Sequence, residues 1–227
     1  PVRLEVRGVS TASGVKDASL SIRAGEIVGM AGIVGSGRTE LARAIAGVDP
    51  MLAGEVSLDG ERLSLKDARA GVRSGIAYIP ESRKDALLMF RSVAENLTLS
   101  QLAEIAAAGV INRGREREIS ADLIERLDVR PANPGAAVTA LSGGNQQKVL
   151  FGKWLATRPR VVLADEPTRG VDIGAKREIY EQIDGLARAG KAILVISSDL
   201  PEAIVVIRPN REAASFFMAM LHGSGKS

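Results

Sequence analysis

A glycine-rich loop between a buried strand and a helix constrains this chain more than any other feature. Residues 26–30 form a short apolar run typical of a buried strand, and residues 38–46 place apolar side chains on one helical face. Between them the sequence GIVGSGRT, residues 32–39, matches the phosphate-loop pattern G-x-x-x-x-G-K-[ST] everywhere except at Arg38. A strand, such a loop and a helix in this order predict an α/β fold.

The chemistry of that loop explains its composition. Glycines let backbone N–H groups converge on phosphate oxygens, and the following helix N-terminus adds a favourable dipole. Thr39 offers a hydroxyl to Mg²⁺, whereas Arg38 keeps the positive charge of the usual lysine but not its compact shape. The alternative is a plain structural turn, and the loop alone does not decide between the two.

A second motif follows an apolar run at residues 161–164. That run ends in two adjacent carboxylates, Asp165 and Glu166. Such a pair lets Asp165 hold Mg²⁺, usually through water, while Glu166 polarises an attacking water. A strand that simply ends in a polar turn is the alternative, and it accounts less well for the phosphate loop upstream.

A third motif, the sequence LSGG at residues 141–144, lies between the first two. Ser142 stands where a helix N-cap belongs, and the two glycines leave the N–H groups of the first turn open to an anion. By itself this is an ordinary capped helix running to Ala156. Its place just before the carboxylate strand makes it informative.

The order of the remaining segments favours a parallel sheet with a helical insert. Short strands occupy the first third of the chain, and residues 92–129 are charged and helical. A linker with two prolines covers residues 130–140. A helix at 175–189 and a strand at 192–196 then restore strand–helix alternation.

Composition excludes several classes of protein. The 227 residues include no cysteine and one histidine, His222, which excludes disulfide scaffolds, Cys-based metal sites and histidine-based triads in the body of the chain. No apolar run approaches the roughly 18–20 residues of a membrane span. The net charge is +3, and residues 207–227 hold three basic residues against one acidic residue. So small and localised an excess gives little support for nucleic-acid binding.

Together these motifs resemble the ATP-binding cassette (ABC) ATPases over roughly residues 4–203. More narrowly, the chain is similar to the second, C-terminal nucleotide-binding domain of bacterial ribose-, xylose- and galactose-type importers. Four motifs carry that similarity: GSGRTE at 35–40, IPESRKD at 79–85, LSGGNQQK at 141–148 and DEPTRGVDIGAK at 165–176. The resemblance implies an α/β fold, a P-loop NTPase of ABC type. It would have a mixed or parallel core sheet, an N-terminal antiparallel part and a helical subdomain at about 90–158.

The resemblance also implies the cofactors ATP and Mg²⁺ and a role for each site residue. The expected metal ligands are Thr39 and Asp165, and Glu166 is the expected base. The nucleotide-binding residues would be Gly32, Gly35, Ser36, Gly37, Arg38, Thr39, Glu40, Ser142, Gly143, Gly144, Asn145 and Asp172. In this family two cassettes pair head to tail. The partner's ATP would therefore be faced by Ser142, Gly143 and Gly144. Asp172 would lie at the contact between the two cassettes.

The same resemblance implies partners and a location. We expect a second cassette, upstream in the same polypeptide, because the chain begins at Pro1 and resembles a second cassette. Transmembrane permease subunits would contact residues 81–90, and a periplasmic sugar-binding protein would act indirectly. A charged surface loop is the alternative for residues 81–90. The expected location is peripheral, on the cytoplasmic face of the inner or plasma membrane.

Three positions depart from an active cassette. Arg38 replaces lysine, Glu81 replaces the glutamine that senses the γ-phosphate, and Ser198 replaces a histidine at the same phosphate. The last two changes remove hydrogen-bond donors where charge develops in the transition state. We expect this domain's own site to bind nucleotide but turn it over poorly, while its LSGG helix completes the partner's site.

Two rival functions remain. A regulatory half that binds nucleotide without catalysis is one, and nucleotide binding with and without a competent partner would discriminate it. An ABC ATPase acting on nucleic acid is the other, but the segment 92–134 lacks heptads and cysteines, and few aromatics are present to stack on bases.

The end of the chain departs from the family pattern. We expect the cassette to cover residues 1–205 and a divergent tail to cover 206–227. Within the tail, the segment 216–221 could form an amphipathic helix, pack on the sheet or stay loose. The final GSGKS imitates a phosphate loop but lacks its first glycine, the preceding strand and the following helix.

Overall fold

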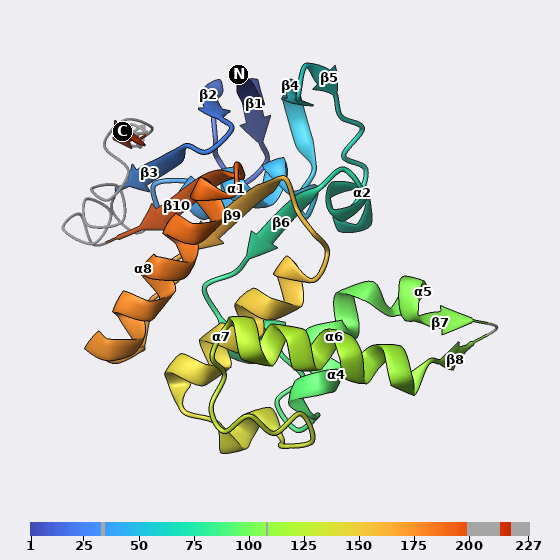
Figure 1. Ribbon diagram of the computed structural model, residues 1–227. Helices are drawn as coiled ribbons and strands as arrows, with labels where there is room; N and C mark the ends of the chain where they lie inside the picture. Colours follow the sequence, from blue (N-terminus) through green and yellow to red (C-terminus); the bar gives the residue numbers. More distant parts are fainter. Residues whose placement is uncertain (33–34, 108, 199–213, 219–227) are drawn as a thin grey trace. The chain divides into compact units, whose positions relative to one another are not determined.

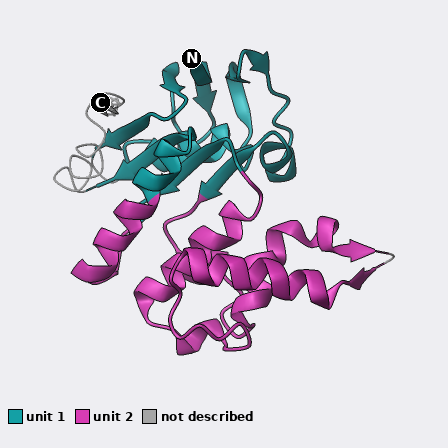
Figure 2. Cartoon of the chain, viewed as in Figure 1, with its two compact units in different colours: residues 1–78, 159–167, 183–227 teal, residues 79–158, 168–182 magenta. Residues whose placement is uncertain are grey.

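The computed structural model describes residues 1–32, 35–107, 109–198 and 214–218 (Figure 1). The chain divides into two compact units, coloured separately in Figure 2. The first unit comprises residues 1–78, 159–167 and 183–227, and the second comprises residues 79–158 and 168–182. The expected helical subdomain at about 90–158 falls within the second unit, which begins earlier and adds the segment at 168–182.

The first unit contains an antiparallel sheet near the N-terminus. Its strands are β1 (Val2–Thr11), β2 (Ala18–Arg23), β4 (Met51–Leu58) and β5 (Glu61–Arg62), in the order β2-β1-β4-β5. Asp59 and Gly60 join β4 to β5 with φ angles of 50° and 86°. A two-residue Asp-Gly loop with both φ angles positive is the favoured hairpin turn. Strands β4 and β5 therefore form a hairpin, although β5 is only two residues long.

The first unit also contains the predicted core sheet. Its strands are β3 (Ile27–Ala31), β6 (Ile76–Ile79), β9 (Val161–Asp165), β10 (Ala192–Ser197) and β11 (Ala214–Met218), in the order β11-β3-β10-β9-β6. Strand β10 pairs in parallel with both β3 and β9. The strands β3, β6, β9 and β10 are buried along their whole length, as parallel strands covered on both faces are.

The register of the core sheet brings three strand ends level. Ser197 of β10 lies beside Ala31 of β3, and Ile196 lies beside Asp165 of β9. Because parallel strands point the same way, the loops that follow β3, β9 and β10 leave from one edge of the sheet. Ligands of open α/β sheets bind at that carboxyl edge.

Helix α1 (Arg38–Ile45) packs into the core of the first unit, and the short helix α2 (Ala68–Arg73) begins at Asp67. Leu41 and Ile45 of α1 belong to one buried cluster that also contains Leu4 from the antiparallel sheet and Leu163 from the core sheet. Asp67 caps α2 by accepting a hydrogen bond from the backbone N–H of Ala70.

The second unit is mainly helical. It contains α3 (Arg83–Ala86), α4 (Val93–Thr98), η1 (Leu99–Gln101), α5 (Leu102–Ile105), α6 (Arg113–Arg126), η2 (Val138–Ala140) and α7 (Gly143–Leu155). Helix α8 (Ile173–Arg188) begins in this unit and ends in the first. Strands β7 (Ala106–Ala107) and β8 (Val110–Ile111) form a small hairpin that the sequence analysis did not predict.

Local capping signals define several helix starts in this unit. Ser92 and Glu95 form a capping box at α4, and Asn112 caps α6. Ser142 caps α7, as its position in the sequence predicted. Helix α4 packs against α6 and α7, where Gly152 allows close approach because a Cβ there would lie 2.4 Å from Leu97 Cδ2.

Of the three alternatives for the segment 216–221, packing on the sheet holds for residues 216–218. These residues belong to β11, which pairs in parallel with β3. Met220, Leu221, His222 and the GSGKS ending lie outside the described residues. The described helices include none that is both long and apolar enough to cross a bilayer.

Candidate functional site

The glycine-rich loop links the end of β3 to the start of α1 in the first unit. Gly35 and Gly37 have φ angles of 83° and 84°, a left-handed conformation that side chains disfavour. A Cβ at Gly35 would meet nothing within 4 Å, so its backbone conformation, rather than space, calls for glycine. Gly35 and Gly37 therefore have backbone conformations that suit a phosphate cradle. Residues 33 and 34 of the motif lie outside the described residues.

Arg38 turns towards the end of β10. Its side chain is buried, and Nη1 donates a hydrogen bond of 2.5 Å to the carbonyl oxygen of Ser197. This is the position where the phosphate-loop pattern has lysine. The guanidinium is therefore engaged with the protein's own backbone at the carboxyl edge of the core sheet.

Asp165 ends β9 as a completely buried carboxylate. Its Oδ2 accepts a hydrogen bond of 3.0 Å from the Tyr78 hydroxyl, and the Thr39 side chain also hydrogen-bonds this carboxylate. Burial raises the pKa of Asp165, while the hydrogen bonds from Thr39 and Tyr78 act in the opposite direction. Burial and the neighbouring charge of Asp165 raise the pKa of Tyr78, so the phenol stays protonated and donates.

Tyr78 is a site residue that the sequence analysis did not predict. The only signal was a tyrosine near the end of an apolar strand, and many such residues are simply part of a core. Its role follows from strand order, because β6 lies next to β9 and so places Tyr78 beside Asp165.

Glu166 is held by the chain that follows β10. Its Oε1 accepts a hydrogen bond of 2.6 Å from the backbone N–H of Ser198, and its own N–H donates to Ile196 O at 2.9 Å. The φ angle of Glu166 is 46°, a conformation uncommon for a residue with a side chain. Such strain is often found at functional sites. Glu166 and Ser198 thus lie together, within hydrogen-bonding distance of each other.

The oxygen atoms around Asp165 fit a hard cation such as Mg²⁺. Asp165 Oδ1 is buried and has no hydrogen-bond partner among the described residues, and the hydroxyls of Thr39 and Tyr78 hydrogen-bond the same carboxylate. The described part of the chain has no group of three or more His, Cys, Asp or Glu side chains that could hold a metal by themselves. One carboxylate with nearby hydroxyls is nevertheless typical for Mg²⁺, which draws its other ligands from water and substrate phosphates.

The LSGG motif forms the N-terminus of α7 in the second unit. Ser142 Oγ accepts a hydrogen bond from Asn145 N, and Asn145 Oδ1 accepts one of 2.7 Å from Arg130 N. A Cβ at Gly144 would lie 2.5 Å from Ala175 Cβ. The motif therefore needs glycine for packing against α8, in addition to any anion it binds.

Glu81 and Asp172 also belong to the second unit. The Glu81 carboxylate forms an ion pair with Arg169, and Asp172 Oδ1 accepts a hydrogen bond of 2.9 Å from Ala175 N at the start of α8. The predicted site residues thus form two groups. Residues 35–40, Asp165, Glu166 and Ser198 are in the first unit, and Glu81, residues 142–145 and Asp172 are in the second.

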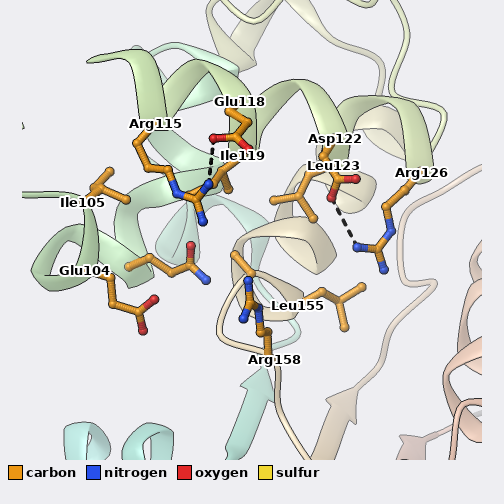
Figure 3. Close-up of a pocket in the computed structure, with 12 residues that line it drawn as sticks. Glu104, Ile105, Arg115, Glu118, Ile119, Asp122, Leu123, Arg126, Leu155 and Arg158 are labelled. Atoms are coloured by element: carbon orange, nitrogen blue, oxygen red, sulfur yellow. Dashed lines mark hydrogen bonds and ion pairs between the residues drawn. The ribbon is translucent and has the colours of Figure 1, made fainter. Parts of the chain in front are cut away.

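A cavity of about 310 Å³ lies in the second unit, between α5, α6 and the end of α7 (Figure 3). Its rim carries the ion pairs Arg115–Glu118, at 2.6 Å, and Arg126–Asp122, at 3.2 Å. Apolar side chains such as Leu123 and Leu155 also line it. None of the predicted site residues lines this cavity.

Solved structures share this fold. The ATP-binding cassette MJ1267 of an ABC transporter aligns with a TM-score of 0.79 at 21% identity, over 91% of this chain and 85% of that one. The dimeric bacterial ABC transporter cassette MJ0796 aligns with a TM-score of 0.76 at 21% identity, over 95% and 94%. At these identities the likeness establishes the ABC cassette fold, as the sequence analysis predicted.

Curated relatives match the sequence more strongly. Ribose import ATP-binding protein RbsA of Geobacillus kaustophilus (strain HTA426) is 48% identical over 203 residues, which are 89% of this chain and 41% of that protein. RbsA of Bacillus subtilis (strain 168) is 44% identical over 201 residues, 88% and 41%. The chain spans about two fifths of the length of these relatives. The family described as ABC transporter matches residues 15–169, from the first β-hairpin to the turn after Glu166. A match over more than half of the sequence, with the same fold, shows that this chain belongs to the ABC transporter family.

Proposed function

We propose that this chain is an ATP-binding cassette that pairs with a second cassette to bind and hydrolyse ATP and so drives sugar import. The cluster of Thr39, Tyr78 and Asp165 beside the phosphate loop carries the proposal. It offers oxygen ligands at the edge where α/β sheets bind nucleotides. Ribose import is the activity named for the relatives at 44–48% identity, so a sugar of this class is the proposed cargo.

Thr39 and Asp165 would hold Mg²⁺. When bound, the cation neutralises charge that develops on the phosphates. Tyr78 orients the Asp165 carboxylate by donating a hydrogen bond to Oδ2. Oδ1 has no hydrogen-bond partner among the described residues, so this oxygen is the proposed ligand. Glu166 would orient water for attack, and the Ser198 N–H fixes one of its oxygens.

This chain's own site would turn ATP over slowly. The buried Arg38 guanidinium donates a hydrogen bond to Ser197 O. This supports a weaker interaction between the cation of this phosphate loop and the phosphates of ATP. Glu81 has Arg169 as an ionic partner, so it is a poor substitute for a neutral glutamine at a phosphate. The chain is therefore proposed as the second, C-terminal cassette, whose LSGG helix completes the active site of its partner.

Membrane permease subunits are the proposed partners of residues 81–90. Two large apolar side chains there are exposed, Leu88 at 47% and Phe90 at 90%. Exposed apolar side chains in a charged loop fit a protein contact better than a solvated surface. The proposed location follows: a peripheral position on the cytoplasmic face of the membrane, with a sugar-binding protein acting indirectly through the permease.

A regulatory half is a second candidate. The engagement of Arg38 with Ser197 favours it, because a phosphate loop without a reaching cation binds nucleotide without accelerating its hydrolysis. The two candidates differ in the LSGG helix. A catalytic pair needs Ser142 for hydrolysis at the partner site, whereas a regulatory half that only binds does not.

The test uses the assembled transporter with both cassettes and its permease. Glu166→Gln in this chain should leave most steady-state ATP hydrolysis intact, whereas Ser142→Ala should reduce it about 10- to 100-fold by removing a transition-state donor. Ribose uptake into vesicles should fall in parallel with hydrolysis. Loss of nearly all hydrolysis with Glu166→Gln would show that this chain's own site is the working one. Full hydrolysis with Ser142→Ala would favour the regulatory half.

A further inference from the structure

The Arg83 guanidinium joins separate segments of the second unit. Nη1 donates to Arg169 O at 2.9 Å and lies 3.5 Å from Gln147 Oε1 on α7, and Nη2 donates to Gly170 O at 3.3 Å. Burial lowers the pKa of Arg83, which nevertheless stays charged as arginines do. One side chain of α3 therefore bonds both the turn after Thr168 and the LSGG helix.

The turn at residues 168–172 is shaped to receive this guanidinium. Gly170 has a φ angle of 67°, and a Cβ there would lie 3.5 Å from Arg83 Nη2. The Glu81–Arg169 ion pair also joins the segment that contains Arg83 to the turn. Here the carboxylate belongs to the segment of Arg83 and the guanidinium belongs to the turn. The turn leads to Asp172, whose carboxylate caps α8.

The first turn of α7 packs against this turn as well. A Cβ at Gly143 would lie 3.4 Å from Gly170 O and 3.6 Å from Arg83 Nη2. Further along α7, the buried Lys148 forms an ion pair of 2.7 Å with Glu178 of α8. The LSGG end of α7, the 168–172 turn and the start of α8 therefore form one block around Arg83.

We infer that Arg83 is a positioning residue that fixes the LSGG end of α7 relative to the turn carrying Asp172. This inference rests on the proposed function, in which both elements face the partner cassette's ATP. Arg83 also lies within the segment 81–90, the proposed permease contact. A displacement of that segment would then reach the LSGG helix and Asp172 together, through one guanidinium.

The geometry calls for arginine rather than for any cation. The planar guanidinium presents donors in a fixed fork, which serves two adjacent carbonyls and an amide oxygen at once. A lysine ammonium is a point charge and holds fewer of these acceptors in place. Lysine at this position is therefore expected to act like a neutral substitution, and not like the native residue.

The experiment measures hydrolysis at the partner site in the assembled transporter. This chain carries Glu166→Gln throughout, so the remaining activity belongs to the partner. The variants are Arg83→Gln, Arg83→Lys and the matched control Arg177→Gln. Arg177 is in the same unit, and its side chain is 84% exposed. Its ion pair among the described residues is with Glu181, one helical turn away. Thermal unfolding and binding of a nonhydrolysable ATP analogue to this chain report on its integrity.

Both Arg83 variants should lower kcat about tenfold or more with KM for ATP changed less than about twofold. Misplaced groups lower kcat alone when their contacts form in the transition state. Arg177→Gln should match the parent. Wild-type kcat with Arg83→Lys would overturn the inference, as would a rise in KM at constant kcat or equal effects of Arg83→Gln and Arg177→Gln. If one of the two Arg83 variants lowers the unfolding temperature, the other variant tests the inference. The criterion stays the same: kcat falls while KM for ATP changes little.

Ser142→Ala, made in the chain that carries Glu166→Gln, distinguishes a failure of the positioning role of Arg83 from a failure of the proposed function. A large loss with Ser142→Ala and none with the Arg83 variants would overturn only the positioning role. No loss with Ser142→Ala would overturn the proposed function, and the inference with it.

Discussion

The hydroxyl oxygen of Tyr78 lies 3.0 Å from Oδ2 of Asp165, across the neighbouring strands β6 and β9. Both side chains are buried, and Asp165 Oδ1 has no hydrogen-bond partner among the described residues. A buried carboxylate with few donors is costly, so this single bond matters to the stability of the fold. It also orients the group that we propose as a Mg²⁺ ligand.

Tyr78→Phe should lower the free energy of unfolding by about 1–3 kcal/mol, because it removes a donor from a buried carboxylate. The chain's other tyrosine, Tyr180, is a matched control, since it is partly exposed and its hydroxyl contact with Thr168 is longer, at 3.4 Å. Tyr180→Phe should cost less than about 1 kcal/mol. Urea unfolding at neutral pH measures both, and equal losses would contradict the special role of Tyr78.

Arg38→Lys should strengthen MgATP binding at this chain's own phosphate loop by about tenfold, since a compact ammonium fits a phosphate cradle better. Hydrolysis there should stay slow, because Glu81 and Ser198 remain. Adding Glu81→Gln and Ser198→His should then raise single-turnover hydrolysis. Nucleotide titration and rapid-quench measurements, with the partner site disabled, follow the two effects. Unchanged or weaker binding by Arg38→Lys would show that the arginine does not limit this site.

Gly144→Ala should destabilise the chain by about 1–3 kcal/mol, since its Cβ would lie 2.5 Å from Ala175 Cβ and force the helices to shift. Gly185→Ala in α8 is the contrasting substitution. A Cβ there meets nothing within 4 Å, so the gain in helix propensity should stabilise by about 0.5–1 kcal/mol. Opposite signs in denaturant unfolding are the expected result, and a stabilised Gly144→Ala would be inconsistent with the packing of α7 on α8.

We expect Lys153 to make the free energy of unfolding change with pH in the alkaline range. Its ammonium is buried, donates to Ala86 O at 2.7 Å and lies 5.4 Å from the Trp154 ring centre. Burial lowers the pKa of Lys153 from its ordinary value of 10.5. Between the lowered pKa and 10.5 the unfolded chain binds more protons than the folded one, so stability rises with pH.

Lys153→Met should remove that rise. The difference in unfolding free energy between wild type and variant, measured from pH 7 to pH 10, should shift in favour of the wild type as pH increases. Lys84→Met is the control, because Lys84 is exposed and should leave the pH dependence unaltered. A pH-independent difference for Lys153→Met would contradict the effect of burial.

Local structure followed from local patterns. Ser142 caps α7, the Asp59-Gly60 pair turns β4 into β5, and the run at 161–165 forms a buried strand. Each depends on residues within a few positions along the chain, where capping, φ preference and side-chain periodicity act directly. The β7–β8 hairpin was missed because each strand is only two residues long and carries no periodicity.

The sequence by itself determined the family, through three ordered motifs, and the kinds of group available to bind phosphate and metal. Only the tertiary structure decided which groups meet. Tyr78 and Asp165 are 87 residues apart, Arg83 and Arg169 are 86 apart, and Arg38 and Ser197 are 159 apart. Contacts at such separations depend on strand order and on how helices pack. Both arise from the burial of many side chains together, so no local pattern contains them.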